Sequence, residues 1–447
     1  MLGEYRIKGR RASEIAADVE RAVGSGELPP GTALPPMRDL AVELGVNPNT
    51  VAAAYRLLRD RGVIETAGRR GSRIRPKPVT TPRDQARIPV PPGARDLSTG
   101  NPDPALLPPL GPALARAAEQ GSALYGHPAA DPELLALARA SFHADGAPDG
   151  SLAVLSGALD TIGRVLSAAL RPGDLVAVED PGWGSLLDLL PALGLRTAPI
   201  GLDEEGPLPG QVAAALAAGA RGLIVTSRAQ NPTGAALTAE RAAALRAVLA
   251  EHPGTLLIED DHGHGMVDQP FRSLAAGADG EPTVASWVLV RSAAKAFAPD
   301  LRVAVAIGDP ATVGRVLGRQ RLDAGWVSHL LQRAVAELWR TDAVPAAELS
   351  AVYRRRRDAL LTALAGHGIA GYGRSGLNVW VPVADETAVT AGLLQRGWVA
   401  APGARFRVQS APGVRLTVAD LQPAEAQRLA DDLAEVLGAS GGGARLI

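Results

Sequence analysis

The stretch VLVRSAAKAFAPDLRVAVAIG, residues 288–308, contains Lys295, the only lysine after residue 77. The chain has 46 Lys and Arg residues among 447, and all but Lys8, Lys77 and Lys295 are arginine. A guanidinium group stays charged, whereas a lysine amine can lose its proton and form a Schiff base. A lysine kept in so arginine-rich a chain is therefore a candidate for covalent chemistry. Compositional bias could equally have left it there without a role.

The neighbours of Lys295 favour a phosphate site. The lysine lies between two strand-like segments, residues 287–291 and 301–307. Ser292 precedes it by three residues and Arg302 follows it by seven. A hydroxyl and a forked guanidinium are both suited to binding a phosphate group beside the lysine.

Three other segments would complete a cofactor site. TLLIEDD ends a predicted strand with Asp260 and Asp261, and a carboxylate there could pair with the pyridine nitrogen of pyridoxal phosphate (PLP). Trp183, in EDPGW, could stack on the cofactor ring. Gly157 and Ala158 begin a predicted helix, where backbone N–H groups favour phosphate. Each residue has a structural alternative: a core aromatic for Trp183, a helix cap for Asp261.

The surrounding sequence predicts an α/β fold. Apolar runs such as LVAVED (175–180) and GLIVTS (222–227) alternate with Ala- and Leu-rich helical stretches, a pattern typical of a mostly parallel sheet. Residues 76–97 contain six prolines and no helical or strand periodicity, which indicates an extended linker. The predicted domains are thus residues 1–75, a linker at 76–97, and residues 98–447.

Residues 1–75 predict a winged helix. A helix over 12–23 is followed by PPMRDLAVELG, a tight turn, and PNTVAAAYRLLRDRG. In a helix-turn-helix motif the start of the second of these helices faces the major groove of DNA. The polar side chains at that start, suited to base edges or phosphates, are Asn47, Asn49 and Thr50. Two short predicted strands then enclose a turn bearing Arg69 and Arg70, which suit phosphate or minor-groove contacts.

Charge supports a DNA-binding role for this head. Residues 1–80 carry 14 basic and 9 acidic residues, whereas the remainder carries 32 and 38. A basic segment attached to an acidic body favours a polyanionic partner for the head. Helix-turn-helix geometry also occurs in helical subdomains that do not contact DNA.

Composition excludes several other classes of protein. The chain has no Cys, which excludes disulfides, thiolate catalysis and Cys-based metal sites. It contains no HExxH motif, so no metal site is predicted. No uncharged apolar stretch approaches the roughly 18 residues that span a bilayer. The first 20 residues have no apolar signal region, so we expect a cytoplasmic protein without membrane contact.

The run from Ser25 to Ile74 closely resembles the DNA-binding domain of the GntR family of bacterial regulators. In that resemblance Arg38 matches the family's DNA-contacting arginine. The expected partner is a double-stranded DNA operator, contacted by Arg38, Asn47, Asn49, Thr50, Arg69 and Arg70.

Residues 98–447 resemble fold-type I PLP enzymes of the class I aminotransferases. The NPTG motif begins at Asn231, which in that family approaches the phenolic oxygen of the cofactor. Tyr125 matches a tyrosine that reaches the phosphate in the partner subunit, and Arg415 an arginine that binds the substrate carboxylate. The resemblance implies a small C-terminal α/β subdomain at about 346–440. It implies PLP contacts from Gly157, Ala158, Trp183, Asn231, Asp260, His262, Ser292, Lys295, Arg302 and Tyr125.

Two positions depart from the aminotransferase pattern. His262 stands near the place of a family tyrosine, and Ala294 precedes the lysine where serine is common. Both departures put full catalytic competence in doubt. Asp260 fits the spacing of related regulators better than Asp261 as the partner of the pyridine nitrogen, and both remain candidates.

The combination resembles the MocR subfamily of GntR regulators. This implies a homodimeric, PLP-dependent transcriptional regulator that senses an amino compound, or PLP itself, through aldimine chemistry at Lys295. Arg415 would bind the carboxylate of an amino-acid effector. The alternative is an active class I aminotransferase that carries a DNA-binding domain, and a regulator that has lost PLP is a third reading.

Overall fold

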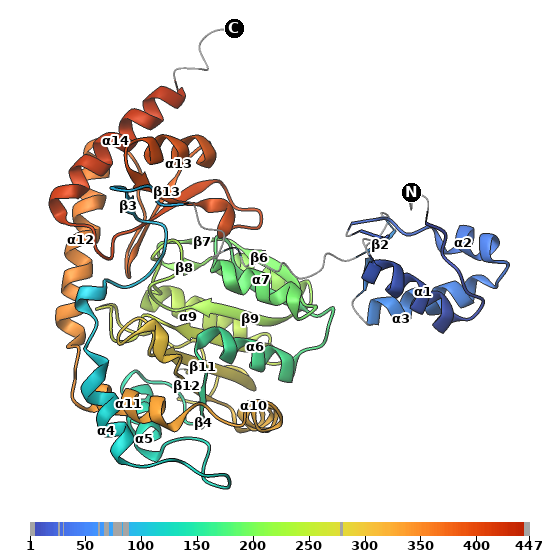
Figure 1. Ribbon diagram of the computed structural model, residues 1–447, viewed down its shortest axis with the longest axis horizontal. Coiled ribbons are helices and arrows are strands. Elements are labelled where there is room, and N and C mark those ends of the chain that lie inside the picture. Colours follow the sequence, from blue (N-terminus) through green and yellow to red (C-terminus); the bar gives the residue numbers. More distant parts are fainter. Residues whose placement is uncertain are drawn as a thin grey trace. The chain divides into compact units, whose positions relative to one another are not determined.

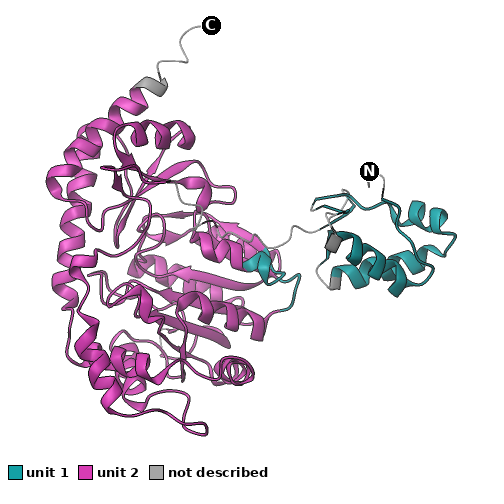
Figure 2. Cartoon of the chain, viewed as in Figure 1, with its two compact units in different colours: residues 1–81, 171–174, 190–196 teal, residues 82–170, 175–189, 197–447 magenta. Residues whose placement is uncertain are grey.

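The computed structural model describes residues 5–25, 27–29, 31–60, 63–66, 71–74, 83, 89–277 and 280–441 (Figure 1). Contacts divide the chain into two compact units (Figure 2). One unit comprises residues 1–81 with the short segments 171–174 and 190–196, and the other comprises the rest. Arg69, Arg70 and most of the predicted linker lie outside the described residues.

The head contains three helices and a two-stranded sheet. The helices are α1 (Ala12–Ser25), α2 (Met37–Leu44) and α3 (Pro48–Asp60), and the antiparallel strands are β1 (Ile64–Thr66) and β2 (Ser72–Ile74). Gly45 ends α2 with a left-handed φ of 64°, and its N–H donates back to Ala41 and Val42 carbonyls. The core includes Ile15, Leu40, Val51, Leu58 and Ile74. This is the expected helix-turn-helix.

The body is built on a seven-stranded sheet. Its order is β4 (Ser151–Leu155), β12 (Ala304–Gly308), β11 (Ser286–Ser292), β10 (Leu256–Asp261), β9 (Ala220–Thr226), β5 (Leu175–Glu179) and β6 (Arg196–Ile200). Strand β10 pairs in parallel with β9 and β11, and β9 in parallel with β5. Strand β12 is antiparallel to both neighbours. The predicted mostly parallel sheet is confirmed, with β12 as the exception.

One strand boundary differs from the prediction. Residues 301–307 were expected to be extended, but Pro299–Leu301 form a short 3₁₀ helix and the strand begins at Ala304. Arg302 between them has a left-handed φ of 48°, a conformation uncommon for a residue with a Cβ. The loop after Lys295 is therefore more tightly turned than its apolar sequence indicates.

Helices surround the sheet. They are α4 (Leu110–Glu119), α5 (Pro132–Ala144), α6 (Ala158–Ala169), α7 (Gly184–Ala192), α8 (Pro209–Ala217), α9 (Ala239–Ala250), α10 (Pro310–Leu322) and α11 (His329–Arg340). A continuous apolar core joins α4, α5, α8, α9 and α11 to the strands and includes Phe142, Leu223, Trp287 and Ile307. Strands β7 (Leu202–Asp203) and β8 (Gly206–Pro207) form a short hairpin.

The C-terminal part has its own sheet and core. Strands β13 (Asn378–Pro382), β16 (Gly413–Thr417) and β15 (Ala401–Pro402) are antiparallel, and helices α12 (Ala346–Gly366), α13 (Glu386–Gln395) and α14 (Pro423–Gly441) accompany them. Strand β3 (Arg95–Asp96) pairs with β14 (Trp398–Val399). Leu97 is buried in the same core. The start of the body thus packs with its C-terminal end.

Among the residues that the structure describes, no helix is both long and apolar enough to cross a membrane.

Candidate functional site

A cavity of about 300 Å³, here called the Lys295 cavity, lies beyond the carboxyl ends of the central strands. Ligands of open α/β sheets bind at these strand ends. Eight of the ten residues predicted to hold the cofactor line it: Ala158, Trp183, Asn231, Asp260, His262, Ser292, Lys295 and Arg302. These residues come from segments between positions 158 and 302 of the chain, so the fold brings together what the sequence separates.

Lys295 is held by the backbone. Its Nζ donates a hydrogen bond of 2.6 Å to the carbonyl oxygen of Gly100. Ser292 Oγ accepts from the backbone N–H of Ala294 at 3.2 Å, which braces the turn that carries the lysine. Gly100 was not predicted as a site residue, because nothing in its local sequence indicates a contact with a residue 195 positions away.

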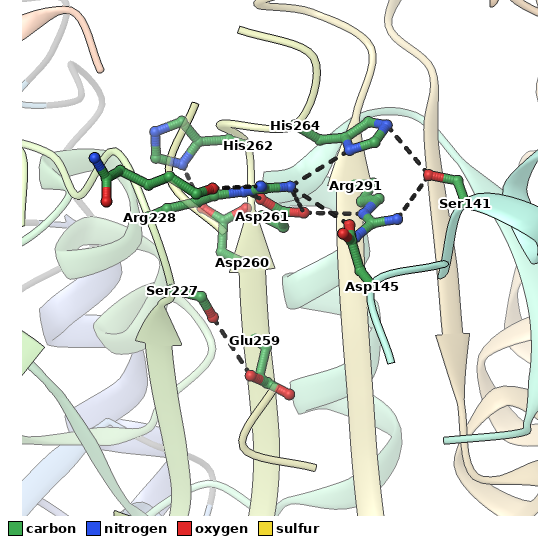
Figure 3. A network of polar contacts seen from close by, with 11 residues as sticks. Ser141, Asp145, Ser227, Arg228, Glu259, Asp260, Asp261, His262, His264 and Arg291 are labelled. Carbon is green, nitrogen blue, oxygen red and sulfur yellow. Dashed lines mark hydrogen bonds and ion pairs between the residues drawn. The ribbon is translucent and has the colours of Figure 1, made fainter. Parts of the chain in front are cut away.

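Asp260 and Asp261 differ sharply in their contacts (Figure 3). Asp260 lines the cavity, and its Oδ2 lies 3.0 Å from His262 Nδ1. Its Oδ1 is buried and has no hydrogen-bond partner among the described residues. A buried unpaired oxygen is costly unless a ligand donor completes it. The protonated ring nitrogen of a pyridine would be such a donor.

Asp261 is saturated instead. Its Oδ1 accepts from Arg228 Nε at 2.7 Å, and its Oδ2 accepts from Arg228 Nη2 and Arg291 Nε at 2.9 Å each. Burial alone would raise the pKa of Asp261, but the two guanidinium groups outweigh it and hold that pKa well below its ordinary value. The geometry therefore favours Asp260 as the carboxylate that pairs with a ligand, and it makes Asp261 part of a structural ion-pair cluster with Arg228 and Arg291.

The end of the cavity near Arg302 is shaped for an anion. Gly157 precedes α6 with a φ of 98° and has no side-chain cap, so the first N–H groups of that helix can donate to a ligand's oxygens. The φ of Gly157 favours glycine, and a Cβ there would lie 2.7 Å from Arg302 Nη2, so the guanidinium would have to move. Arg302 Nη2 also donates to the Ser156 carbonyl at 3.0 Å.

Arg415 reaches the site from the C-terminal sheet. Its Nη1 donates to Asn231 Oδ1 at 2.9 Å and its Nη2 to the Ser98 carbonyl at 2.6 Å. The guanidinium carbon lies 4.5 Å from the centre of the Phe406 ring. Arg415 is buried and is thus no surface ion pair, and it contacts a residue that lines the Lys295 cavity.

Sequence reasoning missed Asp180, which fixes the loop beside Phe406. Its carboxylate accepts hydrogen bonds from the backbone N–H groups of Val408, Gln409 and Ser410 and from the Ser410 hydroxyl, at 2.8 to 2.9 Å. These partners follow it by about 230 positions, a separation that leaves no local sequence signal.

Tyr125 does not reach the cavity of its own chain. It is 92% exposed, and its ring packs edge-on against Trp326 with centroids 5.5 Å apart. Its predicted contact with the phosphate of a partner subunit stays a prediction.

The head exposes most of the predicted DNA-contacting groups that the structure describes. Arg38, Asn47 and Asn49 are exposed and Thr50 is half-buried. Asn47 Oδ1 accepts from the backbone N–H of Asn49 at 2.9 Å and thereby caps α3, which leaves its amide N–H₂ for other contacts.

Two family models cover most of the chain. Residues 11–74 match the bacterial regulatory proteins of the gntR family, and residues 94–433 match the class I and II aminotransferases. A tetra mutant of aspartate aminotransferase from Thermus thermophilus superimposes with a TM-score of 0.68 at 27% identity, over 79% of this chain and 98% of that one.

One relative matches nearly the whole chain, and a second matches more than half of it. The vitamin B6 salvage pathway transcriptional repressor PtsJ of Salmonella typhimurium is 40% identical over 96% of this chain and 99% of its own length. The pyridoxine biosynthesis transcriptional regulator PdxR of Corynebacterium glutamicum is 33% identical over 59% of this chain and 60% of its own. The chain is a DNA-binding transcriptional regulator with an aminotransferase-like domain, and it belongs to the MocR subfamily of GntR regulators.

Proposed function

We propose that this regulator holds PLP in the Lys295 cavity and that a small molecule acting there controls DNA binding by the head. The observation that carries the proposal is the buried Oδ1 of Asp260, which has no hydrogen-bond partner within the described part of the chain and lies in the same cavity as an amine and a helix start suited to an anion. A pyridine ring with an aldehyde and a phosphate matches these three features together.

Each residue then has a separate task. Lys295 would attach the cofactor covalently, and Asp260 would pair with the ring nitrogen while His262 orients Asp260. The N–H groups after Gly157, with Ser292 and Arg302, would bind the phosphate. Trp183 would stack on the ring and Asn231 would contact its oxygen. When bound, PLP supplies an electrophilic carbon that can exchange one amine for another.

Two effectors fit this site. An amino acid would present its carboxylate to Arg415, whose Nη1 now donates to Asn231. PLP itself is the second candidate, favoured by relatives that are named for vitamin B6 salvage and pyridoxine biosynthesis. Either ligand controls DNA binding only if it contacts two arrangements of the protein differently.

We also propose a homodimer, in which Tyr125 of one subunit reaches the phosphate in the other. Support comes from the exposure of Tyr125 and of its neighbour Leu124, which is 66% exposed. Tyrosine is enriched at protein interfaces relative to the rest of the surface. A dimer would present two heads to a bipartite operator.

The test combines spectroscopy with operator binding. Purified protein loaded with PLP should show a cofactor absorbance band that shifts on titration with the effector, and operator affinity should change over the same concentrations. Arg38→Ala should weaken operator binding by about 1–3 kcal/mol and leave the band unchanged. Arg221→Ala, an exposed change in the body, is the matched control.

The competing reading is a working aminotransferase. Steady turnover of an amino donor with a 2-oxo acid, together with operator binding that ignores both PLP and amino compounds, would overturn the proposal. A purified protein that never acquires the cofactor band would point to a regulator that has lost PLP.

A further inference from the structure

A second cavity of about 300 Å³ adjoins the lysine loop and is here called the Trp339 cavity. Ser292 lines both cavities, and Ala293, Ala296 and Phe297, on either side of Lys295 in the sequence, line the second one. No residue predicted from the sequence as part of the site lines it except Ser292. A molecule bound there would touch the segment that positions Lys295.

Most of the wall of the Trp339 cavity is apolar. Val303 and Val305 belong to the chain around β12, Val335 and Leu338 to α11, and the Trp339 ring lies 5.4 Å from that of His264. An apolar cavity of 150 Å³ is known to bind benzene, so about 300 Å³ accommodates a molecule with one ring and a polar group.

The polar end of the cavity holds two arginines that are already satisfied. Arg228 donates through Nε and Nη2 to Asp261, and through Nη1 to a backbone carbonyl at 2.8 Å. Arg291 donates through Nε to Asp261, through Nη1 to a serine hydroxyl at 2.8 Å, and through Nη2 to Asp145. Because both guanidinium groups are already paired with carboxylates, their charge is neutralised and this end is not built for an anion.

Acceptors remain on the same wall. Among the described residues, Asp145 uses its Oδ2 for the arginines, and its side chain is 30% exposed, which leaves Oδ1 for a donor. Asp342 also lines the cavity and is exposed. The charges around this end are those of Arg228 and Arg291 and of three carboxylates, Asp145, Asp261 and Asp342. The sum is one negative charge, which favours a ligand with one positive charge.

A metal ion suits this cluster poorly. Ligand atoms of Asp145, Asp261 and His264 lie within 4.8 Å of one another, a spacing that would allow a cation. Both oxygens of Asp261, however, already accept from Arg228 and Arg291. An ion there would displace two guanidinium groups or lie against them.

We propose that the Trp339 cavity is a second small-molecule site, which binds an amine with an apolar, one-ring body. The ammonium group donates to Asp145, and the ring lies among Val335, Leu338 and Trp339. This site does not require PLP, so it stands or falls separately from the function proposed above.

The experiment uses full-length Lys295→Ala protein freed of PLP, in which an amine has neither a PLP–lysine linkage nor a free PLP aldehyde to attack. Benzylamine, benzyl alcohol and benzoate are the probes, and binding is followed by ligand-observed NMR. Benzylamine should bind saturably, benzyl alcohol more weakly, and benzoate at least tenfold more weakly than benzylamine. Benzoate binding as tightly as benzylamine would overturn the ligand class, and absence of benzylamine binding would overturn the site.

Two substitutions locate the binding. Ala346 lines the cavity and is exposed, so Ala346→Trp should block the mouth without disturbing the core and should weaken benzylamine binding at least tenfold. Ala347→Trp, on the neighbouring exposed residue outside the lining, is the matched control and should leave binding unchanged. Equal affinity in the two variants would overturn the assignment to this cavity.

Discussion

Asp260 and Asp261 are adjacent on β10, yet their side chains point to opposite faces of the sheet and make different kinds of contact. Successive side chains of a strand point to opposite faces. Asp260 lines the Lys295 cavity with one oxygen unpaired, whereas Asp261 accepts three hydrogen bonds from two buried arginines. A buried carboxylate with a free hydrogen-bonding oxygen, such as that of Asp260, indicates a ligand site. A buried carboxylate whose oxygens are all used by arginines, such as that of Asp261, indicates a structural ion pair.

The comparison extends to the two cavities. On the Asp260 side, charged groups face a cavity with capacity left for a ligand. On the Asp261 side the cations are neutralised within the protein, and only a weaker acceptor remains. A charged cofactor therefore suits the first side, and a small amine the second.

The largest expected effect comes from a matched pair of isosteric changes. Asp261→Asn leaves two buried arginines undercompensated and should lower the free energy of unfolding by about 3–5 kcal/mol. Asp260→Asn leaves no buried arginine undercompensated and keeps a side-chain oxygen for the contact with His262, so it should change stability by less than about 1 kcal/mol. Urea unfolding of the two cofactor-free variants measures both. Equal losses of unfolding free energy in the two variants would contradict the difference between Asp260 and Asp261 described above.

Cofactor affinity should reverse that order. Asp260→Asn removes a charge-assisted hydrogen bond to the ring nitrogen, which is worth about 1.5–3 kcal/mol, or roughly a ten- to hundredfold weaker binding of PLP. The measurement is a titration of the cofactor band at constant protein concentration. If a folded Asp261→Asn variant binds PLP more weakly than Asp260→Asn does, the two aspartates have been assigned the wrong way round.

A smaller effect concerns pH on the Asp261 side. Burial, and then the charge of Arg291, lower the pKa of His264 from 6.5 to about 3. The unfolded chain takes up this proton below pH 6.5 while the folded protein does not, so stability is lost as pH falls from about 6.5 toward 3. By pH 5 the loss from this half-buried ring is at most about 2 kcal/mol.

The His264→Asn variant isolates this loss of stability, because the remaining titratable groups contribute alike in both proteins. The difference in unfolding free energy between wild type and variant should shrink as pH falls from 7 to 5. Parallel stability curves would show that His264 is not held neutral by its surroundings.

Much of the fold could be predicted because buried parallel strands are continuous apolar runs. GLIVTS at 222–227 matches β9, and TLLIEDD at 255–261 matches β10. The boundary before β12 was wrong because the left-handed turn at Arg302 carries no signal in the neighbouring apolar residues.

The candidate site could be predicted where its residues follow strand ends or belong to short motifs, as Asn231 and Lys295 do. Partners joined only by tertiary contact could not be. The contacts of this kind join residues about 30 to 230 positions apart in the sequence. They are those of Gly100 with Lys295, of Asp180 with residues 408–410, and of Asp261 with Arg228 and Arg291. Periodicity and motif spacing do not extend over such separations.

Covalent trapping tests the central claim most directly. Borohydride reduction of the PLP-loaded protein, followed by peptide mass spectrometry, locates the modified lysine, and the chain offers only Lys8, Lys77 and Lys295. We expect a pyridoxyl adduct on Lys295 and little on the other two lysines. An unmodified Lys295, or labelling spread evenly over all three lysines, would contradict it.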